Sequence, residues 1–297
     1  QNNIEDELLK KDILKINKEL RVIRFVPIDE YIEYQVNLAK STKIWQEARE
    51  KNDFEHFVPI LEEIVDYNKK LIKYLETDTL KGYDVLLDMY EEGSDTKQYD
   101  KFFEYLKVEL VPFVIEVTMG RRQKFNRKLT SREYPIVDQK EISKYLIKQF
   151  GYDLQRGAIR DTIHPFTSGI STDDIRITSD YAINNFTASI FSVLHEIGHA
   201  MYNQNNDPIF NGTFLFGAPS YGMHVAQARM YENMIGRSYA FWSKHYDKLL
   251  EVYPKQLNGI GLLEFYQYIN RVKRSKIRLE ADELTYSLHI MVRYEIE

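Results

Sequence analysis

The motif His195-Glu196-Ile197-Gly198-His199 constrains this chain more strongly than any other part of its sequence. Two histidines four residues apart on a helix project from the same face, so their ring nitrogens can share one metal ion. The carboxylate of Glu196, next to the first histidine, can then take a proton from a metal-bound water. The motif therefore predicts a helix that carries two metal ligands, His195 and His199, and a general base.

The residues around the motif are typical of a helix. Residues 185–189 offer small polar side chains suited to an N-cap, and the run from 203 to 208 stops helices. Between them, apolar residues recur at steps of three and four: Ile190, Val193, Leu194, Ile197, Ala200 and Met201. The two histidines thus lie on an apolar stripe, as a buried metal site requires. The alternative is a core helix whose histidines are satisfied by hydrogen bonds.

The composition limits the class of protein. A chain of 297 residues, with 43% hydrophobic and 29% charged residues, is typical of a soluble globular protein with a sizeable core. The net charge of -5 gives no reason to expect nucleic acid as a partner. The sequence has no apolar run that predicts a membrane span, no recognisable signal peptide and no cysteine. We therefore expect a cytoplasmic protein that does not use thiolates as metal ligands.

The pattern of apolar residues changes along the chain. Residues from about 4 to 120 are predicted to be almost wholly helical. Residues 156–162 and 175–178 alternate polar and apolar side chains, which predicts two short strands. Such a hairpin beside the motif helix would offer an edge to which an extended peptide could add.

Helices are predicted again in the last part of the chain, over about 220–244, 261–272 and 276 to the end. We therefore expect one domain over residues 1–297. Within it, residues 1–150 form a helical scaffold lobe and residues 151–297 form the lobe that carries the motifs.

A zinc ion held by two histidines needs a third protein ligand, which leaves one position for water. The predicted helix that starts near residue 220 contains one carboxylate, Glu232, and one further imidazole, His224. Either side chain could bind a metal on chemistry alone. Spacing does not choose between them.

Four motifs occur in a fixed order along the chain: His164-Pro165-Phe166, Asp174-Ile175-Arg176-Ile177-Thr178, His195-Glu196-Ile197-Gly198-His199, and Ile277-Arg278-Leu279-Glu280-Ala281-Asp282. They resemble the HPF, DxRxT, HExxH and IRxxAD motifs of the thermostable carboxypeptidase Taq family. The flanking residues 232–238 and 281–286 also read like that family, and weaker similarity covers most of the chain. The resemblance implies a mainly α-helical, elongated metallopeptidase fold with a central groove and a very small β-element beside the motif helix.

One family motif is altered in this chain. The family carries a motif HESQ whose glutamate is the third zinc ligand, and the matching residues here are His224-Val225-Ala226-Gln227. Valine stands at the ligand's position, and an isopropyl group cannot bind zinc. The change implies weakened zinc binding in a degenerate homologue, a knock-out or a redesigned sequence. Family members also continue beyond residue 297, so the chain resembles a trimmed core of the family.

The resemblance implies that His195 and His199 hold zinc, for which cobalt can substitute, and that Glu196 acts as the general base. The implied activity is that of a zinc metallocarboxypeptidase, which removes C-terminal residues from peptides. The alternative is a catalytically inactive relative, or an engineered scaffold, that retains a peptide-binding groove. Family members are often homodimers, although no dimer face is evident in this sequence.

An exopeptidase of this kind must recognise the free terminal carboxylate, which a guanidinium group does best. Two family motifs supply candidates, Arg278 and Arg176. Arg278 could instead form a salt bridge with Asp282, and Arg176 could pair with Asp174. His164, before a proline in a predicted turn, could touch substrate or orient other groups of the site.

Overall fold

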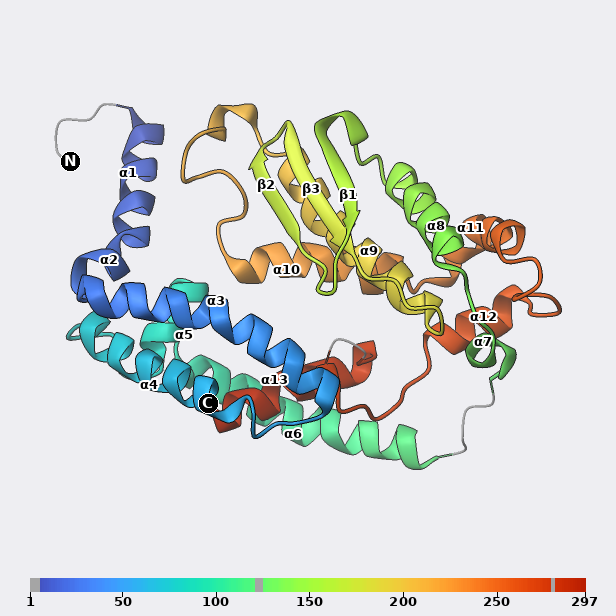
Figure 1. Cartoon of the computed structure of the whole chain (residues 1–297), viewed down its shortest axis with the longest axis horizontal. Coiled ribbons are helices and arrows are strands. Elements are labelled where there is room, and N and C mark those ends of the chain that lie inside the picture. Colours follow the sequence, from blue (N-terminus) through green and yellow to red (C-terminus); the bar gives the residue numbers. More distant parts are fainter. Residues whose placement is uncertain (1–5, 121–124, 279–280) are drawn as a thin grey trace. The chain divides into compact units, whose positions relative to one another are not determined.

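The computed structural model describes residues 6–120, 125–278 and 281–297, which form mostly helices and one small β-sheet (Figure 1). The predicted mainly α-helical fold with a small β-element beside the motif helix is therefore confirmed. The chain divides into two compact units, residues 1–99 and 100–297. The predicted lobes, 1–150 and 151–297, stay a prediction. Within the described ranges, no helix combines the length and the apolar character needed to cross a membrane.

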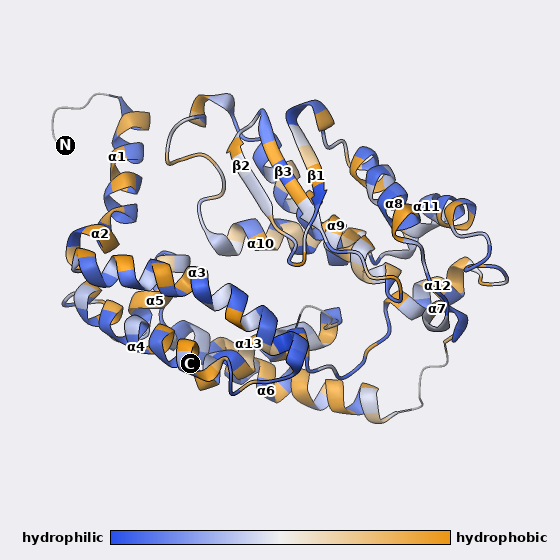
Figure 2. Cartoon of the chain, viewed as in Figure 1, coloured by the Kyte–Doolittle hydropathy of each residue, from blue (hydrophilic) through white to orange (hydrophobic). Residues whose placement is uncertain are grey.

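The first unit is built from amphipathic helices, whose turns alternate between polar and apolar residues in Figure 2. Its described helices are α1 (Glu7–Glu19), α2 (Arg21–Phe25), α3 (Ile28–Lys51), α4 (Val58–Leu75) and α5 (Asp84–Tyr90). The core of the unit gathers around one face of α4, because Tyr67, Leu71 and Leu75 recur at steps of four and are buried together with Val26 and Val85.

The second unit contains the motif. Helix α6 (Thr96–Met119) continues into it from the first unit. Its other elements are α7 (Lys128–Ser131), α8 (Ile136–Gln149), the 3-10 turns η1 (Leu154–Arg156) and η2 (Pro208–Phe210), β1 (Gly157–Asp161), β2 (Thr167–Ser171), β3 (Asp174–Ser179), α9 (Phe186–Gln204), α10 (Tyr221–Arg229), the π-helix η3 (Met230–Ile235), α11 (Tyr239–Val252), α12 (Leu262–Ile269) and α13 (Glu283–Ile296).

The sheet has three strands in the order β1-β3-β2. β1 pairs with β3 in parallel, with Ala158 opposite Arg176, whereas β2 runs antiparallel to β3. The prediction that the first and last of these strands form a hairpin is therefore wrong. The strand between them, β2, has no alternation that would predict it: it contains two serines and Gly169, where the pairing with β3 is irregular.

Helix α9 carries the motif and lies against the sheet, α8 and α10 (Figure 1). Asn185 caps its first turn by accepting a hydrogen bond from the backbone N–H of Ala188, as the sequence predicts. The predicted apolar stripe is buried except for Met201, which is partly buried, and Val193, Leu194 and Ile197 are wholly inaccessible to solvent. The motif is thus fixed within the main core of the unit.

The later helices differ in their limits from the prediction. The expected helix over 220–244 is divided into α10, η3 and α11, and Ser238 caps the start of α11. The last helix begins at Glu283 instead of near 276, because the Asp282 side chain accepts hydrogen bonds from the backbone N–H groups of Leu284 and Thr285.

Candidate metal centre

His195 and His199 lie one turn apart on α9, with ring centroids 4.9 Å apart and nearly perpendicular ring planes. Two imidazoles that share a tetrahedral zinc through Zn–N bonds of about 2.1 Å have ring centres about 5 Å apart. The spacing of this pair therefore fits two ligands of one metal ion. Both rings are partly exposed, while the backbone that holds them is packed into the core.

Glu196 is buried between the motif helix and the sheet, with 5% of its surface exposed. The hydroxyl of Thr167, the first residue of β2, donates a hydrogen bond of 2.6 Å to its Oε2. Burial raises the pKa of Glu196, although this hydrogen bond and the neighbouring His195 act in the opposite direction. A carboxyl group with a raised pKa is suited to accept and release a proton near neutral pH.

Glu232 lies in the π-helix η3 and contacts His195 directly. Its Oε2 is 2.9 Å from Nδ1 of His195 and 2.9 Å from Nη1 of Arg229. Burial alone would raise the pKa of Glu232, but the hydrogen bond from His195 and the charges of Arg229 and Arg237 hold it below its ordinary value. Glu232 is thus an ionised carboxylate that occupies one nitrogen of His195 and leaves Nε2 for a ligand.

Sequence reasoning did not predict this contact, because Glu232 lies 37 residues after His195 in the chain, within the π-helix. Whether Glu232 or His224 binds a metal, which the sequence left open, stays untested. Its carboxylate is engaged with an imidazole and two guanidinium groups, of Arg229 and Arg237.

The position expected for the third ligand holds Val225, on α10, whose side chain has no donor atom. Within residues 6–120, 125–278 and 281–297, no group of three or more His, Cys, Asp or Glu side chains is arranged to hold a metal ion. The described side chains therefore fit two of the three protein ligands of a catalytic zinc, and they do not complete the set.

A second imidazole of α10 lies against the motif. The ring centroids of His224 and His199 are 4.2 Å apart. Burial lowers the pKa of His199 to about 3, with His224 and His195 adding to the effect, and burial also lowers the pKa of His224. Both imidazoles are therefore neutral at physiological pH, which is the form that binds metals.

The two helices meet at a glycine. A Cβ atom added to Gly198 would lie 2.5 Å from Cα of Ala228, so only glycine lets α10 approach α9 this closely. The small residues at 198 and 228 let α10 pack closely against α9, where His224 contacts His199.

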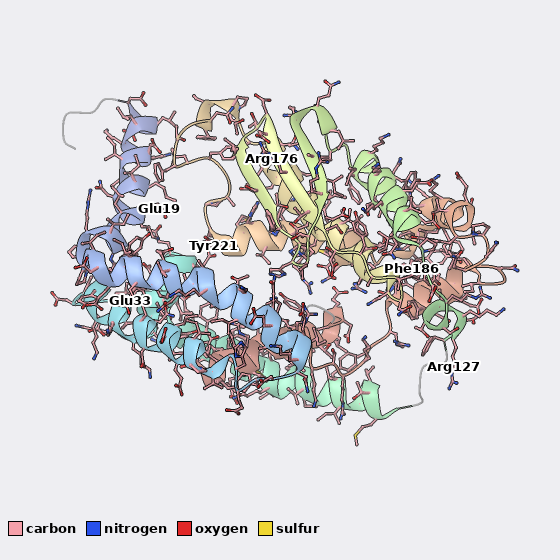
Figure 3. All side chains as sticks on the ribbon, in the orientation of Figure 1. Glu19, Glu33, Arg127, Arg176, Phe186 and Tyr221 are labelled. Atoms are coloured by element: carbon pink, nitrogen blue, oxygen red, sulfur yellow. The ribbon has the colours of Figure 1, made fainter. Side chains whose placement is uncertain are left out.

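The predicted substrate-binding residues differ in whether they contact the groups around the motif. Arg176, labelled in Figure 3, lies on β3 and is exposed. It pairs with Asp174 through two hydrogen bonds of 2.7 and 2.6 Å. His164 is exposed in the segment between β1 and β2. In the described part of the chain, no hydrogen bond or ion pair joins either side chain to His195 or Glu196.

Arg278 is linked to the site through an aromatic neighbour, Tyr286, and a charged one, Arg229. Its Nη1 donates a hydrogen bond of 2.6 Å to the hydroxyl of Tyr286, and the guanidinium of Arg229 lies 3.8 Å from the centre of the same ring. The alternative partner of Arg278, Asp282, caps α13 instead. Residues 279 and 280 of the predicted motif lie outside the described residues.

Comparison with known proteins assigns this arrangement to a family. The family model for Carboxypeptidase Taq (M32) metallopeptidase matches residues 1–297. The chain is 40% identical to Carboxypeptidase 1 of Bacillus subtilis over 288 residues, which cover 97% of this chain and 57% of the relative. It is 35% identical to Thermostable carboxypeptidase 1 of Thermus thermophilus, over 92% of this chain and 55% of the relative. The chain thus spans little more than half the length of these relatives.

Solved structures give the same result. The structure of Pyrococcus furiosus carboxypeptidase matches with a TM-score of 0.89 and 32% identity, over 98% of this chain and 58% of that one. The M32 carboxypeptidase of Deinococcus radiodurans R1 matches with a TM-score of 0.81 and 33% identity, over 94% of this chain and 57% of that one.

Proposed function

The chain belongs to the carboxypeptidase Taq (M32) metallopeptidase family, and we propose that it carries the reaction centre of a metallocarboxypeptidase that removes C-terminal residues from peptides. The observation that supports this most is the arrangement on α9. His195 and His199 stand at the spacing of two ligands of one metal, and the buried carboxylate of Glu196 lies between them in the chain.

Glu196 has the properties of a general base. Its Oε2 is held by the hydroxyl of Thr167, and its raised pKa lets it accept a proton from the attacking water and pass that proton to the leaving amine. The strand that supplies Thr167, β2, is an edge of the sheet. An extended peptide can add to such an edge, next to the base.

His195 and His199 are the metal ligands that we propose, with zinc as the metal and cobalt as its substitute. Glu232 orients His195. For the free carboxylate of the substrate we propose a guanidinium, and Arg278 is the better candidate, because contacts through Tyr286 and Arg229 tie it to the site. Arg176 and His164 stay candidates for substrate contact.

A second function is favoured by one residue. Because Val225 provides no donor, a metal held only by His195 and His199 would bind weakly. The chain would then be an inactive relative that binds peptides without cleaving them.

An assay of peptide cleavage distinguishes the carboxypeptidase from the inactive relative. The purified chain is equilibrated with zinc and given an N-terminally blocked peptide with a free C-terminal carboxylate, and the same peptide as its C-terminal amide. Release of single C-terminal residues from the free acid alone supports the carboxypeptidase. Binding of the free acid without release, with release gained in Val225→Glu, supports the inactive relative. Equal cleavage of acid and amide contradicts a carboxypeptidase.

A further inference from the structure

A cavity of about 480 Å³ lies between α8 and the edge of the sheet that β1 forms. Its lining comes from Lys144 and Lys148 on α8, from Leu154, and from residues 157–160 of β1. In Figure 1, α8 runs beside β1. None of the lining residues belongs to α9 or α10, so the cavity is distinct from the candidate metal centre.

The charged side chains of this lining are all cationic. Lys144, Lys148 and Arg160 are exposed. In the described parts of the chain, no ion pair joins any of the three to a carboxylate. Nη1 of Arg160 donates a hydrogen bond of 3.1 Å to the carbonyl of Ile159, which keeps the guanidinium beside β1. The cavity therefore carries three positive charges that the chain itself does not balance.

The carboxylates next to the lining in the sequence are bound to other cations. Asp161, at the end of β1, pairs with Lys140. Glu141, on α8, pairs with Lys248. The protein as a whole has a net charge of -5, so this cationic cavity stands out from an acidic background. A local excess of positive charge favours an acidic partner and speeds its association.

β1 offers a free backbone edge along the same cavity. Among the described strands, β1 pairs with β3 only. Alternate residues of a strand with one neighbour turn their N–H and C=O groups away from that neighbour. Within the described residues, no N–H of Gly157–Asp161 donates a hydrogen bond outside the sheet. Such an edge can accept a further strand.

The spacing of the lysines matches the repeat of an extended peptide. Lys144 and Lys148 stand four residues apart on α8, which is about 6 Å along a helix axis. Side chains on one face of a strand recur every 6.6 Å or about that distance. Carboxylates at alternate positions of an added strand can therefore meet successive cations. A small inorganic anion would leave the strand edge unused.

We propose that the cavity between α8 and β1 is a docking site for an extended acidic peptide segment of a partner protein. The segment adds to β1 as a further strand and presents alternate carboxylates to Lys144, Lys148 and Arg160. Main-chain hydrogen bonds supply affinity, and the cations select the acidic sequence. Docking needs neither a metal nor a free C-terminus, so it is independent of the proposed peptidase activity.

Fluorescence anisotropy with the metal-free full chain tests the proposal. The probe is a dye-labelled peptide as long as β1, five residues, in which glutamate alternates with valine and the C-terminus is an amide. The amide and a chelator prevent its recognition as a metallopeptidase substrate. Two altered peptides are compared with it. One has glutamine in place of glutamate, and the other is N-methylated at alternate amides. Inorganic phosphate is the competing small anion.

The protein variant is Lys144→Gln/Lys148→Gln. Its matched control is Lys69→Gln/Lys73→Gln, which removes two exposed lysines with the same spacing on α4 that do not line the cavity. Circular dichroism verifies that both variants are folded. Carbodiimide coupling followed by mass spectrometry identifies the lysines that touch the peptide's carboxylates.

The acidic peptide is expected to bind the unmodified chain and the control equally, and Lys144→Gln/Lys148→Gln about 3- to 30-fold more weakly at low salt. The N-methylated peptide is expected to lose about 10-fold in affinity, because it cannot complete the strand hydrogen bonds. Added salt should reduce the difference between the variant and the control. Coupling is expected at Lys144 or Lys148.

Equal binding by Lys144→Gln/Lys148→Gln and its control would overturn the proposal, and so would the absence of any binding. Equal affinity for the N-methylated peptide, or its displacement by phosphate as readily as that of the unmethylated one, would make the cavity a site for small anions and overturn the peptide partner. Docking by a chain that cleaves no peptide would contradict only the proposed function, and cleavage without docking would contradict only this proposal.

Discussion

Oε2 of Glu232 lies 2.9 Å from Nδ1 of His195, and the same oxygen accepts a hydrogen bond of 2.9 Å from Arg229. The carboxylate is charged and acceptor-only, so Nδ1 of His195 carries the proton and Nε2 keeps its lone pair. One contact therefore fixes both the tautomer and the orientation of a proposed metal ligand.

Replacing Glu232 by glutamine is expected to weaken metal binding. The amide keeps the shape of the side chain but accepts the hydrogen bond from His195 less strongly, and outer partners of this kind contribute about 10- to 100-fold in affinity. Chelator competition with cobalt measures the effect. Glu251→Gln, an exposed glutamate that pairs with Lys248, is the control. Unchanged affinity in Glu232→Gln would show that the carboxylate has no influence on the ligand.

Glu196→Gln is expected to reduce peptide cleavage by about 10²- to 10⁴-fold, the usual contribution of a positioned base. The amide cannot take up a proton, while its size and its contact with Thr167 are retained. Metal affinity is expected to stay within a few-fold of the unmodified chain. Initial rates on the blocked peptide, at saturating metal, give the result. Full activity in this variant would remove Glu196 from the proposed mechanism.

The sequence predicted α9 closely, since its N-cap, its apolar stripe and the run that ends it are all local signals. It did not predict β2, because a strand that contains Gly169 and two serines forms only through pairing with β3. Local patterns also joined α10, η3 and α11 into one helix. A turn at Gly236 and Arg237 separates η3 from α11, which starts after the Ser238 cap.

The candidate site was predictable in part. His195, Glu196 and His199 are candidates because of their spacing; the two rings lie 4.9 Å apart and Glu196 is buried, while their roles stay predictions. The hydrogen bonds of Glu232 with His195 and of Thr167 with Glu196 join residues far apart in the chain. Such contacts are set by tertiary packing, which one sequence does not specify.

Gly198→Ala is expected to destabilise the second unit. The added methyl group would lie 2.5 Å from Cα of Ala228, so α9 and α10 would have to separate. Overpacking of this kind costs about 1–3 kcal/mol. Chemical denaturation measures the free energy of unfolding, and Ser192→Ala on the same helix is the control, because its hydroxyl has no partner. Stability equal to that of the control would contradict the close helix contact.

His245 is expected to make the protein less stable in acid. Burial lowers the pKa of this imidazole, and the nearby charge of Lys244 adds to the effect. The unfolded chain takes up a proton on this residue near pH 6.5, whereas the folded chain does so only at lower pH. Its contribution to stability is therefore complete above about pH 6.5 and declines as the pH falls toward the folded pKa.

The measurement is the free energy of unfolding between pH 7.5 and about 5. His245→Phe keeps a ring against Phe241 and removes the titrating group, so its stability should decline less over this range. Tyr145→Phe, which removes only the 2.8 Å hydrogen bond to His245, should retain the decline. Identical slopes in the unmodified chain and His245→Phe would rule out this contribution.

The π-helix η3 sets the position of Arg237 relative to Glu232. Residues five apart in an α-helix point about 140° away from each other, whereas the wider π-turn brings them to nearly the same side. The N–H of Gly236 accordingly donates to the carbonyl of Tyr231, and Arg237 reaches Glu232 with 3.9 Å between Nη2 and Oε1. Deleting one residue from this turn would keep every side chain of the site and still swing Arg237 away. The number of residues in this turn therefore determines the geometry of the site as much as their identity does.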